Sequence, residues 1–272
     1  MSAVARALGL SRSHLSAHRA PKESRGRHVS APSDAPLLAR IRPLVAVRAT
    51  YGYRRVTAML NREQGPAVNP KRVYRVMAAA KLLLPRHGVL PERRHDGKVI
   101  TPRSNMRWCS DGLEIRCGSG ERVRMAFALD CCDREVVGWV AKAEPLLGED
   151  VRDLMAESLE YRFGAGTTRA PQSIQWLSDN GPQYTAKDTR DFGRDCGFLV
   201  CTTPSYSPES NGMAEAFVKT FKRDYAYLAK LDTAANVIAE IRGWIADYND
   251  HHPHSGLGMR SPRQFRASNH AV

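Results

Sequence analysis

Three acidic residues in the second half of the 272-residue chain have the types and spacing of a metal-binding catalytic centre. Asp111 lies in the alternating stretch RWCSDGLEIRC, on the same predicted strand face as Cys109 and Leu113. A charged group on such an apolar face is costly unless something pairs with it. Asp179 directly follows the apolar stretch SIQWLS, at the predicted end of a strand, where active sites of α/β sheets gather. Glu215 lies in a predicted helix, SPESNGMAEAFVKTFKRDY.

The helix that carries Glu215 has two distinct faces. Its apolar stripe consists of Met213, Phe217, Phe221 and Tyr225. A different face carries Asn211, Glu215, Lys219 and Lys222, at steps of four, four and three residues. If this helix packs beside the two strands, Glu215 meets Asp111 and Asp179, and Lys222 stands two turns away.

Clustered carboxylates repel one another unless a cation lies among them, and their oxygens are ligands that Mg²⁺ and Mn²⁺ prefer. Two such ions about 4 Å apart can activate an attacking oxygen and stabilise the leaving oxygen of a phosphodiester. Each residue also has a structural interpretation: Asp111 bonded to backbone donors, Asp179 in an Asp-Asn-Gly turn, and Glu215 paired with Lys219 on the surface. The order and spacing of all three together favour the catalytic interpretation.

Turn residues divide the surrounding sequence into strands and helices in the order β-β-β-α-β-α-β-α. The first three strands form a predicted antiparallel meander over residues 107–145. A helix follows and ends at Gly164, and a later helix begins at a capping box formed by Thr185 and Asp188 and runs through Cys196. Ser207 and the proline after it are predicted to start the helix of Glu215. This order predicts an α/β fold with a mixed five-stranded sheet and flanking helices.

Basic residues are concentrated before this region. The chain carries a formal net charge of +13, and residues 1–108 hold 22 of its 41 Lys and Arg but only 5 of its 28 Asp and Glu. A basic half can bind a polyanion through phosphate contacts and counterion release. The alternative, a solvated basic surface, explains the asymmetry between the halves less well.

Two small helical units are predicted in the basic half. Residues 1–20 contain a partial helix-turn-helix pattern with Arg12 in the first turn of its second helix, and residues 21–35 form a basic linker. Residues 36–84 form a second unit, in which Asn69 caps a helix with Pro70 at its first position. A second basic linker covers residues 85–104. The candidate nucleic-acid contacts of the second unit, which a polar helix face would also explain, are Arg54, Arg55, Lys71, Arg72 and Arg75.

The six cysteines form no Cys-x-x-Cys pair, so we expect reduced core residues rather than a zinc site. No apolar stretch approaches the ~20 residues of a membrane span, and the chain begins without a secretory signal pattern. We therefore expect no membrane partner and a protein that stays in the compartment where it is made.

The motifs resemble those of a known family. Thirty-five residues separate Asp179 from Glu215, and Lys222 follows seven residues later, which resembles the Asp, Asp, 35-residue gap, Glu signature of insertion-sequence transposases and retroviral integrases. The segments RWCSD, ALDCCDREVVGW, WLSDNGPQY and YNDHHPHSGLGMRSPRQF look like those of OrfB-type transposases. YGYRRV and NPKRVYRVM look like their helix-turn-helix region, so the resemblance covers residues 36–268.

The resemblance implies a ribonuclease-H-like catalytic domain, placed at residues 105–252 and followed by a C-terminal extension at 253–272. It implies two Mg²⁺ ions, or Mn²⁺ in their place, held by Asp111, Asp179 and Glu215, and metal-dependent strand cleavage and transfer at element ends. Lys222 would contact DNA near the cut end, with Asn180, Asn211 and Lys219 beside it. The DNA partners would be the element's terminal repeats and the target.

The family also implies partners and a location. Because the reaction pairs two DNA ends, we expect a homo-multimer on DNA. OrfB proteins are commonly fused to an upstream-frame DNA-binding product, so a partnership of that kind is expected here. The location implied is the bacterial cytoplasm, on the nucleoid when bound to DNA.

The sequence contains two further clusters of polar residues and is compatible with two further functions. His251, His252 and His254 resemble a metal cluster, but the intervening Pro253 favours a structural loop. Asp130 and Asp133 are paired acids that the resemblance places in a hairpin outside the catalytic set. The alternative functions are a DNA-binding regulator or inactive inhibitor of transposition, against which the intact acidic triad argues, and a plain ribonuclease-H-like nuclease.

Overall fold

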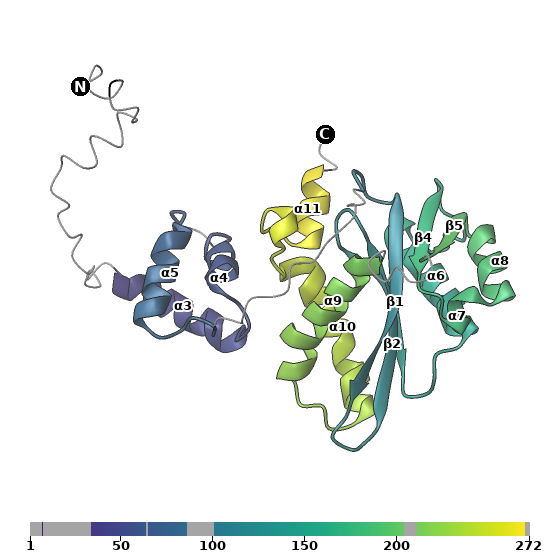
Figure 1. The fold of residues 1–272 in the computed structure, drawn as a ribbon, viewed down its shortest axis with the longest axis horizontal. Helices are drawn as coiled ribbons and strands as arrows, with labels where there is room; N and C mark the ends of the chain where they lie inside the picture. Colours follow the sequence, from purple (N-terminus) through teal and green to yellow (C-terminus); the bar gives the residue numbers. More distant parts are fainter. Residues whose placement is uncertain (1–6, 8–33, 64, 86–100, 204–210, 270–272) are drawn as a thin grey trace.

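The computed structural model describes residues 7, 34–63, 65–85, 101–203 and 211–269 (Figure 1). The predicted partial helix-turn-helix at residues 1–20, including Arg12, lies outside the described residues except for Ala7. Residues 21–33 and 86–100 of the two predicted linkers also lie outside them. No helix among the described residues is both long and apolar enough to span a membrane.

The described N-terminal part is a unit of three helices, α3 (Ala35–Val47), α4 (Tyr53–Leu60) and α5 (Pro70–Ala79). Its core contains the predicted inward residues Val73, Val76 and Met77 of α5, packed against Leu37 and Ile41 of α3. The predicted cap of α5 is confirmed, because the Asn69 side chain accepts a hydrogen bond of 2.8 Å from the Lys71 N–H.

The rest of the chain is built on a five-stranded sheet in the order β3-β2-β1-β4-β5. The strands are β1 (Arg107–Arg116), β2 (Arg122–Asp130), β3 (Val136–Lys142), β4 (Ile174–Ser178) and β5 (Phe198–Thr202). The first three form the predicted antiparallel meander, whereas β4 pairs in parallel with both β1 and β5. The mixed sheet predicted from the element order is confirmed.

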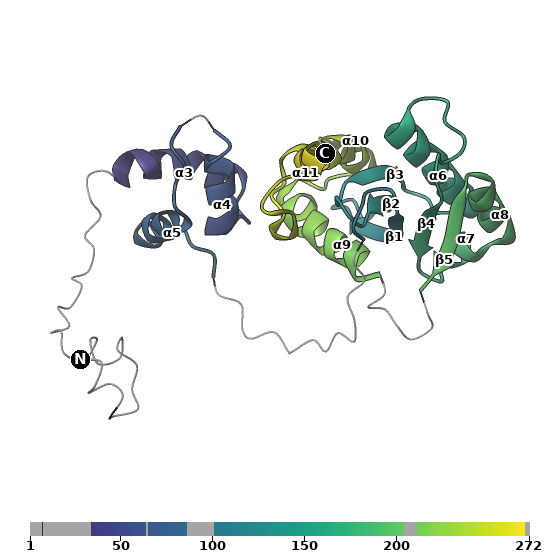
Figure 2. The same ribbon diagram turned by 90° about the horizontal axis from the view of Figure 1, so that it is seen from above.

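Helices cover both faces of this sheet (Figure 2). One face packs against α9 (Gly212–Asp224) and α10 (Ala234–His251), with the apolar residues of β1 and β2 between them. The other face packs against α6 (Gly148–Phe163), and Trp108 and Trp176 lie fully buried there. The shorter helices are α7 (Pro182–Thr185), α8 (Lys187–Asp195) and α11 (Pro262–Asn269), with single turns η3 (Ala226–Leu228) and η4 (Ser255–Leu257).

Two predicted helix starts need comment. The capping box at Thr185 and Asp188 is wrong: Thr185 ends α7, its hydroxyl donates to the Gly181 carbonyl, and α8 begins after Ala186 with no side-chain cap. The short α7 uses the proline at its first position, which the sequence reading overlooked. Ser207, the predicted cap of the Glu215 helix, lies outside the described residues, and α9 is described from Gly212.

The three-helix unit contacts the sheet domain through polar side chains. Arg48 forms an ion pair with Asp247 of α10, and Arg55 pairs with Asp224 at the end of α9 at 3.0 Å. The Tyr51 hydroxyl lies 3.1 Å from Nδ1 of the buried His252. These contacts join segments that are more than 160 residues apart in the sequence.

Candidate active site

The register of the sheet places Asp111 and Asp179 side by side. Strands β1 and β4 run parallel, with Cys109 opposite Leu177, so Asp111 and Asp179 each lie two residues beyond this last pair. As predicted, Asp111 shares the face of Cys109, which packs in the core beneath α9. The Asp111 side chain is half-buried, and its Oδ1 accepts a 2.7 Å hydrogen bond from the Gly112 N–H.

Asp179 begins a tight loop after β4. Its Oδ1 accepts a 3.0 Å hydrogen bond from the Gly181 N–H, which fixes the carboxylate as in an Asx turn. The next residue, Asn180, is exposed and donates from Nδ2 to the Thr203 carbonyl at 3.0 Å. Asp179 therefore forms a turn, as the structural interpretation predicted, and this turn is compatible with its candidate catalytic role.

Glu215 lies in the first turn of α9, whose buried face rests on the sheet. Ala214, Phe217 and Phe221 make that face, so Phe217 and Phe221 of the predicted stripe are confirmed as buried. The Glu215 side chain is 41 % exposed, and Lys219 Nζ lies 3.5 Å from its Oε2. Asn211, directly before the helix, is buried, and its Nδ2 donates to the Ser110 carbonyl at 3.2 Å. Asn211 thus ties the start of α9 to the strand of Asp111 rather than facing solvent.

The three carboxylates influence one another electrostatically. Burial raises the pKa of the Asp111 carboxyl to about 6, and the negative charges of Asp179 and Glu215 add to this rise against the lowering effect of the Gly112 hydrogen bond. Such a shift is typical of carboxylates that share a site without a cation. Among the described residues, no group of three or more His, Cys, Asp or Glu side chains is arranged so that it could hold a metal ion.

Two residues behind the carboxylates were missed by the sequence reading. The Tyr184 hydroxyl of α7 lies 3.0 Å from Ser110 Oγ, and both side chains are buried. Burial raises the pKa of Tyr184, which keeps its hydroxyl protonated. This contact braces β1 next to Asp111. The only sequence signal for this contact was the alternation of RWCSDGLEIRC, which places Ser110 on the opposite face of the strand from Asp111.

The predicted DNA contacts divide into side chains with and without an ion pair to a described residue. Lys222 forms no ion pair with any described residue, and Arg54 and Lys71 line a groove of about 740 Å³ between α4 and α5. Arg55 is occupied by Asp224 at the contact between the units. The remaining two, Arg72 and Arg75 of α5, pair with Asp34, at 2.8 and 3.9 Å.

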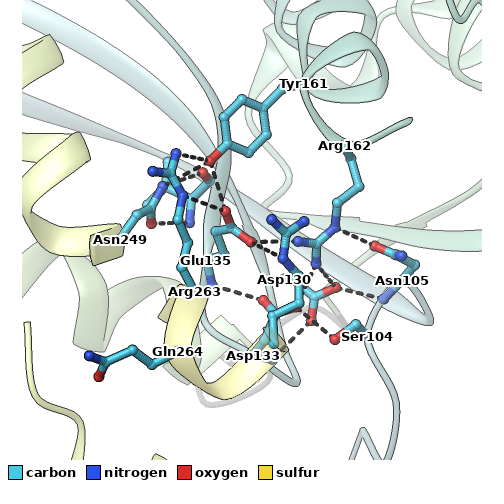
Figure 3. A network of polar contacts seen from close by, with 12 residues as sticks. Ser104, Asn105, Asp130, Asp133, Glu135, Tyr161, Arg162, Asn249, Arg263 and Gln264 are labelled. Atoms are coloured by element: carbon cyan, nitrogen blue, oxygen red, sulfur yellow. Dashed lines mark hydrogen bonds and ion pairs between the residues drawn. The ribbon is translucent and has the colours of Figure 1, made fainter. Parts of the chain in front are cut away.

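Asp130 and Asp133 belong to a different cluster, shown in Figure 3. Both are fully buried, as is Glu135, and all three pair with the guanidinium of Arg162 at 2.6 to 3.0 Å. Although burial opposes it, these carboxylates raise the pKa of Arg162. We call this group the Arg162 cluster: Asp130, Asp133, Glu135 and Arg162. It joins the hairpin between β2 and β3 to α6, and Arg263 and Arg266 of α11 also pair with Glu135.

The histidines near the C-terminus pack against aromatic rings and do not form a metal-binding cluster among the described residues. The His252 ring stacks on Tyr248 at 5.4 Å and meets His254 edge-on at 4.8 Å. Burial, with nearby positive charges, lowers the pKa of both, to about 3 for His254. His251 is exposed on the last turn of α10.

Comparisons with known proteins agree with this architecture. Residues 101–208 and 200–262 match integrase core domain families, and residues 32–88 match a helix-turn-helix-like domain family. The chain is 45% identical to the transposase InsD of insertion element IS2A/D/F/H/I/K of Escherichia coli, over 97% of this chain and 90% of that protein. InsD of IS2-9 of Escherichia coli K12 is also 45% identical, over 97% of this chain and 88% of its own length.

Comparison with solved structures finds weaker similarities. A simian T-cell lymphotropic virus intasome in complex with PP2A regulatory subunit B56 gamma is 15% identical, over 82% of this chain and 73% of that chain, with a TM-score of 0.49. The catalytic domain of the Mos1 mariner transposase is 14% identical, over 61% of this chain and 76% of that chain, with a TM-score of 0.44.

A sheet in the order β3-β2-β1-β4-β5 with an integrase core match defines a polynucleotidyl transferase of the Asp-Asp-Glu class, on a ribonuclease-H-like fold. The preceding unit is a helix-turn-helix-like domain, so the protein binds DNA. The identity to InsD over nearly the whole chain is decisive for the family: this chain belongs to the OrfB-type insertion-sequence transposases.

Proposed function

We propose that this transposase cleaves and joins DNA strands at the ends of its insertion element, using Asp111, Asp179 and Glu215 as the catalytic centre. The observation that supports this most is electrostatic: the charges of Asp179 and Glu215 add to the raised pKa of Asp111, although the three residues lie 68 and 36 positions apart in the sequence. In this region the only described cation paired with any of them is Lys219. The charge imbalance is the kind that a bound divalent cation relieves.

The donor set fits Mg²⁺, with Mn²⁺ as a substitute, because it consists of carboxylate oxygens without thiolates or imidazoles. When bound, two such ions supply activation of the attacking oxygen and charge stabilisation of the leaving oxygen. Asp111, Asp179 and Glu215 would hold them. The hydrogen bonds from Gly112 and Gly181 orient two of the carboxylates.

The protein itself contributes positioning. The Asn211 side chain joins the start of α9 to β1, and this contact would help to hold Glu215 near Asp111. Lys222 and Lys219, on the same helix, would hold phosphates near the cut end. Arg54 and Lys71 would contact duplex DNA from the groove between α4 and α5. The substrates would be the element's terminal repeats, where water attacks first, and a target phosphodiester, which the freed 3′-hydroxyl then attacks.

The proposal extends to assembly. Pairing two element ends requires at least two copies of the chain, so the active form would be a homo-multimer on DNA. An upstream-frame DNA-binding product would act with it, either fused or as a partner. The working location would be the cytoplasm, on the nucleoid when DNA is bound. Within the predicted boundaries, residues 36–84 would bind DNA and residues 105–252 would catalyse cleavage and strand transfer.

The test is a cleavage and strand-transfer assay with the purified full chain, DNA carrying its own element's end, and Mg²⁺. The three variants to test are Asp111→Asn, Asp179→Asn and Glu215→Gln. Each should lower the rates of cleavage and strand transfer by about 10²-fold to 10³-fold, as the loss of one group that stabilises the transition state does. Binding of the DNA should change by less than about twofold. Glu240→Gln, which removes an exposed acid of α10, is the matched control and should keep full activity.

A wild-type chain that binds the DNA without chemistry should be tested again with the upstream-frame product added. Continued inactivity in that mixture would contradict the proposal and favour a regulatory role. Retained cleavage in one of the three variants would remove that residue from the catalytic set.

A further inference from the structure

A hollow of about 200 Å³ lies between α9, the hairpin that joins β2 to β3, and the segment 253–259. Its described lining includes the guanidinium groups of Arg55 and Arg134, the imidazole of His254, and the hydroxyls of Thr220 and Ser255. No acidic residue is among the described residues that line it. The remaining lining residues are apolar or aromatic, so the hollow joins an apolar floor to a small set of charged and neutral donors without a carboxylate. Such a set of donors is suited to a tetrahedral oxyanion.

Arg134 is a charged side chain of this lining that has no partner among the described residues. Its guanidinium forms no hydrogen bond or ion pair with any described residue, whereas Arg55 is already paired with Asp224. Arg134 occupies the hairpin turn with a positive φ of 62°, and it is only partly exposed. A half-buried guanidinium without a counter-ion is costly, which makes it a ready site for an external anion.

The turn at Gly256 makes room for this guanidinium. A Cβ on Gly256 would lie 2.2 Å from Arg134 Nη2 and 2.7 Å from Cζ, so any side chain there would displace the group. The φ of Gly256 is not in the left-handed region, so its lack of a side chain is needed for the close approach rather than for the backbone conformation. The 255–257 turn therefore holds Arg134 against the hollow.

His254 supplies a second unsatisfied group. Its Nε2 is buried and has no hydrogen-bond partner among the described residues. Burial and the positive charges of Arg134, Arg55 and Arg62 lower its pKa to about 3, with Asp224 acting in the opposite direction. The ring is therefore neutral at physiological pH, and a neutral imidazole can donate one hydrogen bond to an oxyanion.

The wall of the hollow formed by α9 lies on the helix that carries Glu215 but on another face. Met213 and Phe217 of the apolar stripe line the hollow together with Ala216 and Thr220, so it lies around the helix from the candidate catalytic carboxylates. Arg55, on another wall, comes from the helix-turn-helix-like unit. This placement beside a DNA-binding unit favours the phosphates of bound DNA as the source of the anion.

We propose that this hollow is a phosphate-binding site, in which Arg134, with Arg55 and His254, holds a backbone phosphate of the bound DNA. This rests on the proposed strand-transfer function. The same chemistry would accept free inorganic phosphate, and the two sources are separated by the test.

The test measures binding of a labelled element-end duplex to the full chain across a range of salt concentrations, without divalent ions. Arg134→Gln should weaken binding about tenfold near 0.1 M salt and reduce the salt slope by about 0.9, the value of one lost phosphate contact. Gly256→Ala keeps the net charge but displaces the guanidinium, so it should weaken binding in the same direction. Arg116→Gln, which removes a 79 % exposed arginine at the far end of β1, should change binding less than twofold.

A second arm measures the shift of the thermal unfolding midpoint caused by inorganic phosphate. The proposal is supported when phosphate no longer raises the unfolding midpoint of Arg134→Gln and the salt dependence of its DNA binding is shallower than that of the wild type. Loss of the phosphate shift alone would assign the hollow to free phosphate and overturn the DNA contact. An unchanged slope and an unchanged phosphate shift would overturn the site altogether.

The design separates this inference from the proposed function. A wild-type chain that does not bind the element-end duplex would contradict the proposed function, and the phosphate arm would still decide whether the hollow binds the anion. Urea unfolding of each variant confirms that it is folded, so a lost signal is not mistaken for unfolding.

Discussion

Two groups of three carboxylates lie around the same sheet, and their negative charges are neutralised in different ways. In the Arg162 cluster every acid is fully buried and paired with one guanidinium, which is itself only 1 % exposed (Figure 3). The second group, the candidate catalytic carboxylates Asp111, Asp179 and Glu215, is partly exposed, and its one described cation is Lys219 at 3.5 Å. Charge alone does not distinguish the two groups, because each contains three acids.

The difference lies in where the neutralising cation comes from. Arg162 belongs to the chain, so its cluster is closed and links the hairpin, α6 and α11 whatever the solvent contains. Among the described residues, the candidate catalytic carboxylates have no partner equivalent to Arg162, and the charges of Asp179 and Glu215 add to the raised pKa of Asp111. A cluster with an internal cation is structural, and one without it is suited to bind a cation from outside.

The largest effect on stability is expected at Arg162. Arg162→Met removes the shared partner of three buried carboxylates and should lower the free energy of unfolding by about 3–5 kcal/mol. Urea unfolding followed by circular dichroism measures this. Glu215→Gln, measured in parallel, should change the free energy by less than about 0.5 kcal/mol, as exposed positions do. Equal losses in the two variants would remove the distinction between the clusters.

A smaller effect is expected from pH, through a buried base rather than an acid. The pKa of His254 is lowered to about 3, against about 6.5 in the unfolded chain. Above pH 6.5 the His254 ring is neutral in both the folded and the unfolded state, so it does not lower the free energy of unfolding there. As the pH falls from 6.5 toward 3, the unfolded state binds a proton that the folded state does not, and stability is lost.

Between pH 7.5 and 5.0 this linkage should cost about 2 kcal/mol from His254 alone. The measurement is the urea midpoint at the two pH values for the wild type and for His254→Gln. The variant should show a shallower dependence on pH. A variant that loses as much stability on acidification as the wild type would assign the acid sensitivity to other groups.

The smallest effect is expected at Lys219. Its pair with Glu215 is exposed on both sides, with side chains 62 % and 41 % accessible, so Lys219→Met should change the free energy of unfolding by less than about 0.5 kcal/mol. Thermal and urea unfolding both test this. A loss above 2 kcal/mol would show that Lys219 acts as an internal cation like Arg162, and the contrast between the two clusters would fail.

Local patterns were enough to predict much of the sheet domain. Alternation in RWCSDGLEIRC predicted that Asp111 shares the core face of its strand with Cys109, and the order of the elements predicted the antiparallel meander and a mixed five-stranded sheet. The Asn69 cap was predictable because an N-cap and the proline after it act within one turn. Each of these features depends on residues close in the sequence.

Contacts between distant segments were not predictable in this way. Arg55 and Arg72 read as exposed basic residues of helices, but their carboxylate partners, Asp224 and Asp34, come from other segments. Asn211 has the helical spacing of an exposed face, yet it lies before the helix proper and turns inward to Ser110. Which acid meets Arg162 depends on the packing of α6 against the hairpin, which no local pattern encodes.

The most direct test of the contrast is a calorimetric titration of Mn²⁺ into the full chain, with Asp111→Asn and Asp133→Asn as the paired variants. The account predicts binding by the wild type, loss of at least one site in Asp111→Asn, and wild-type binding in Asp133→Asn wherever that variant remains folded. Unchanged Mn²⁺ binding in Asp111→Asn would contradict the claim that the unpaired cluster is the one that takes its cation from outside.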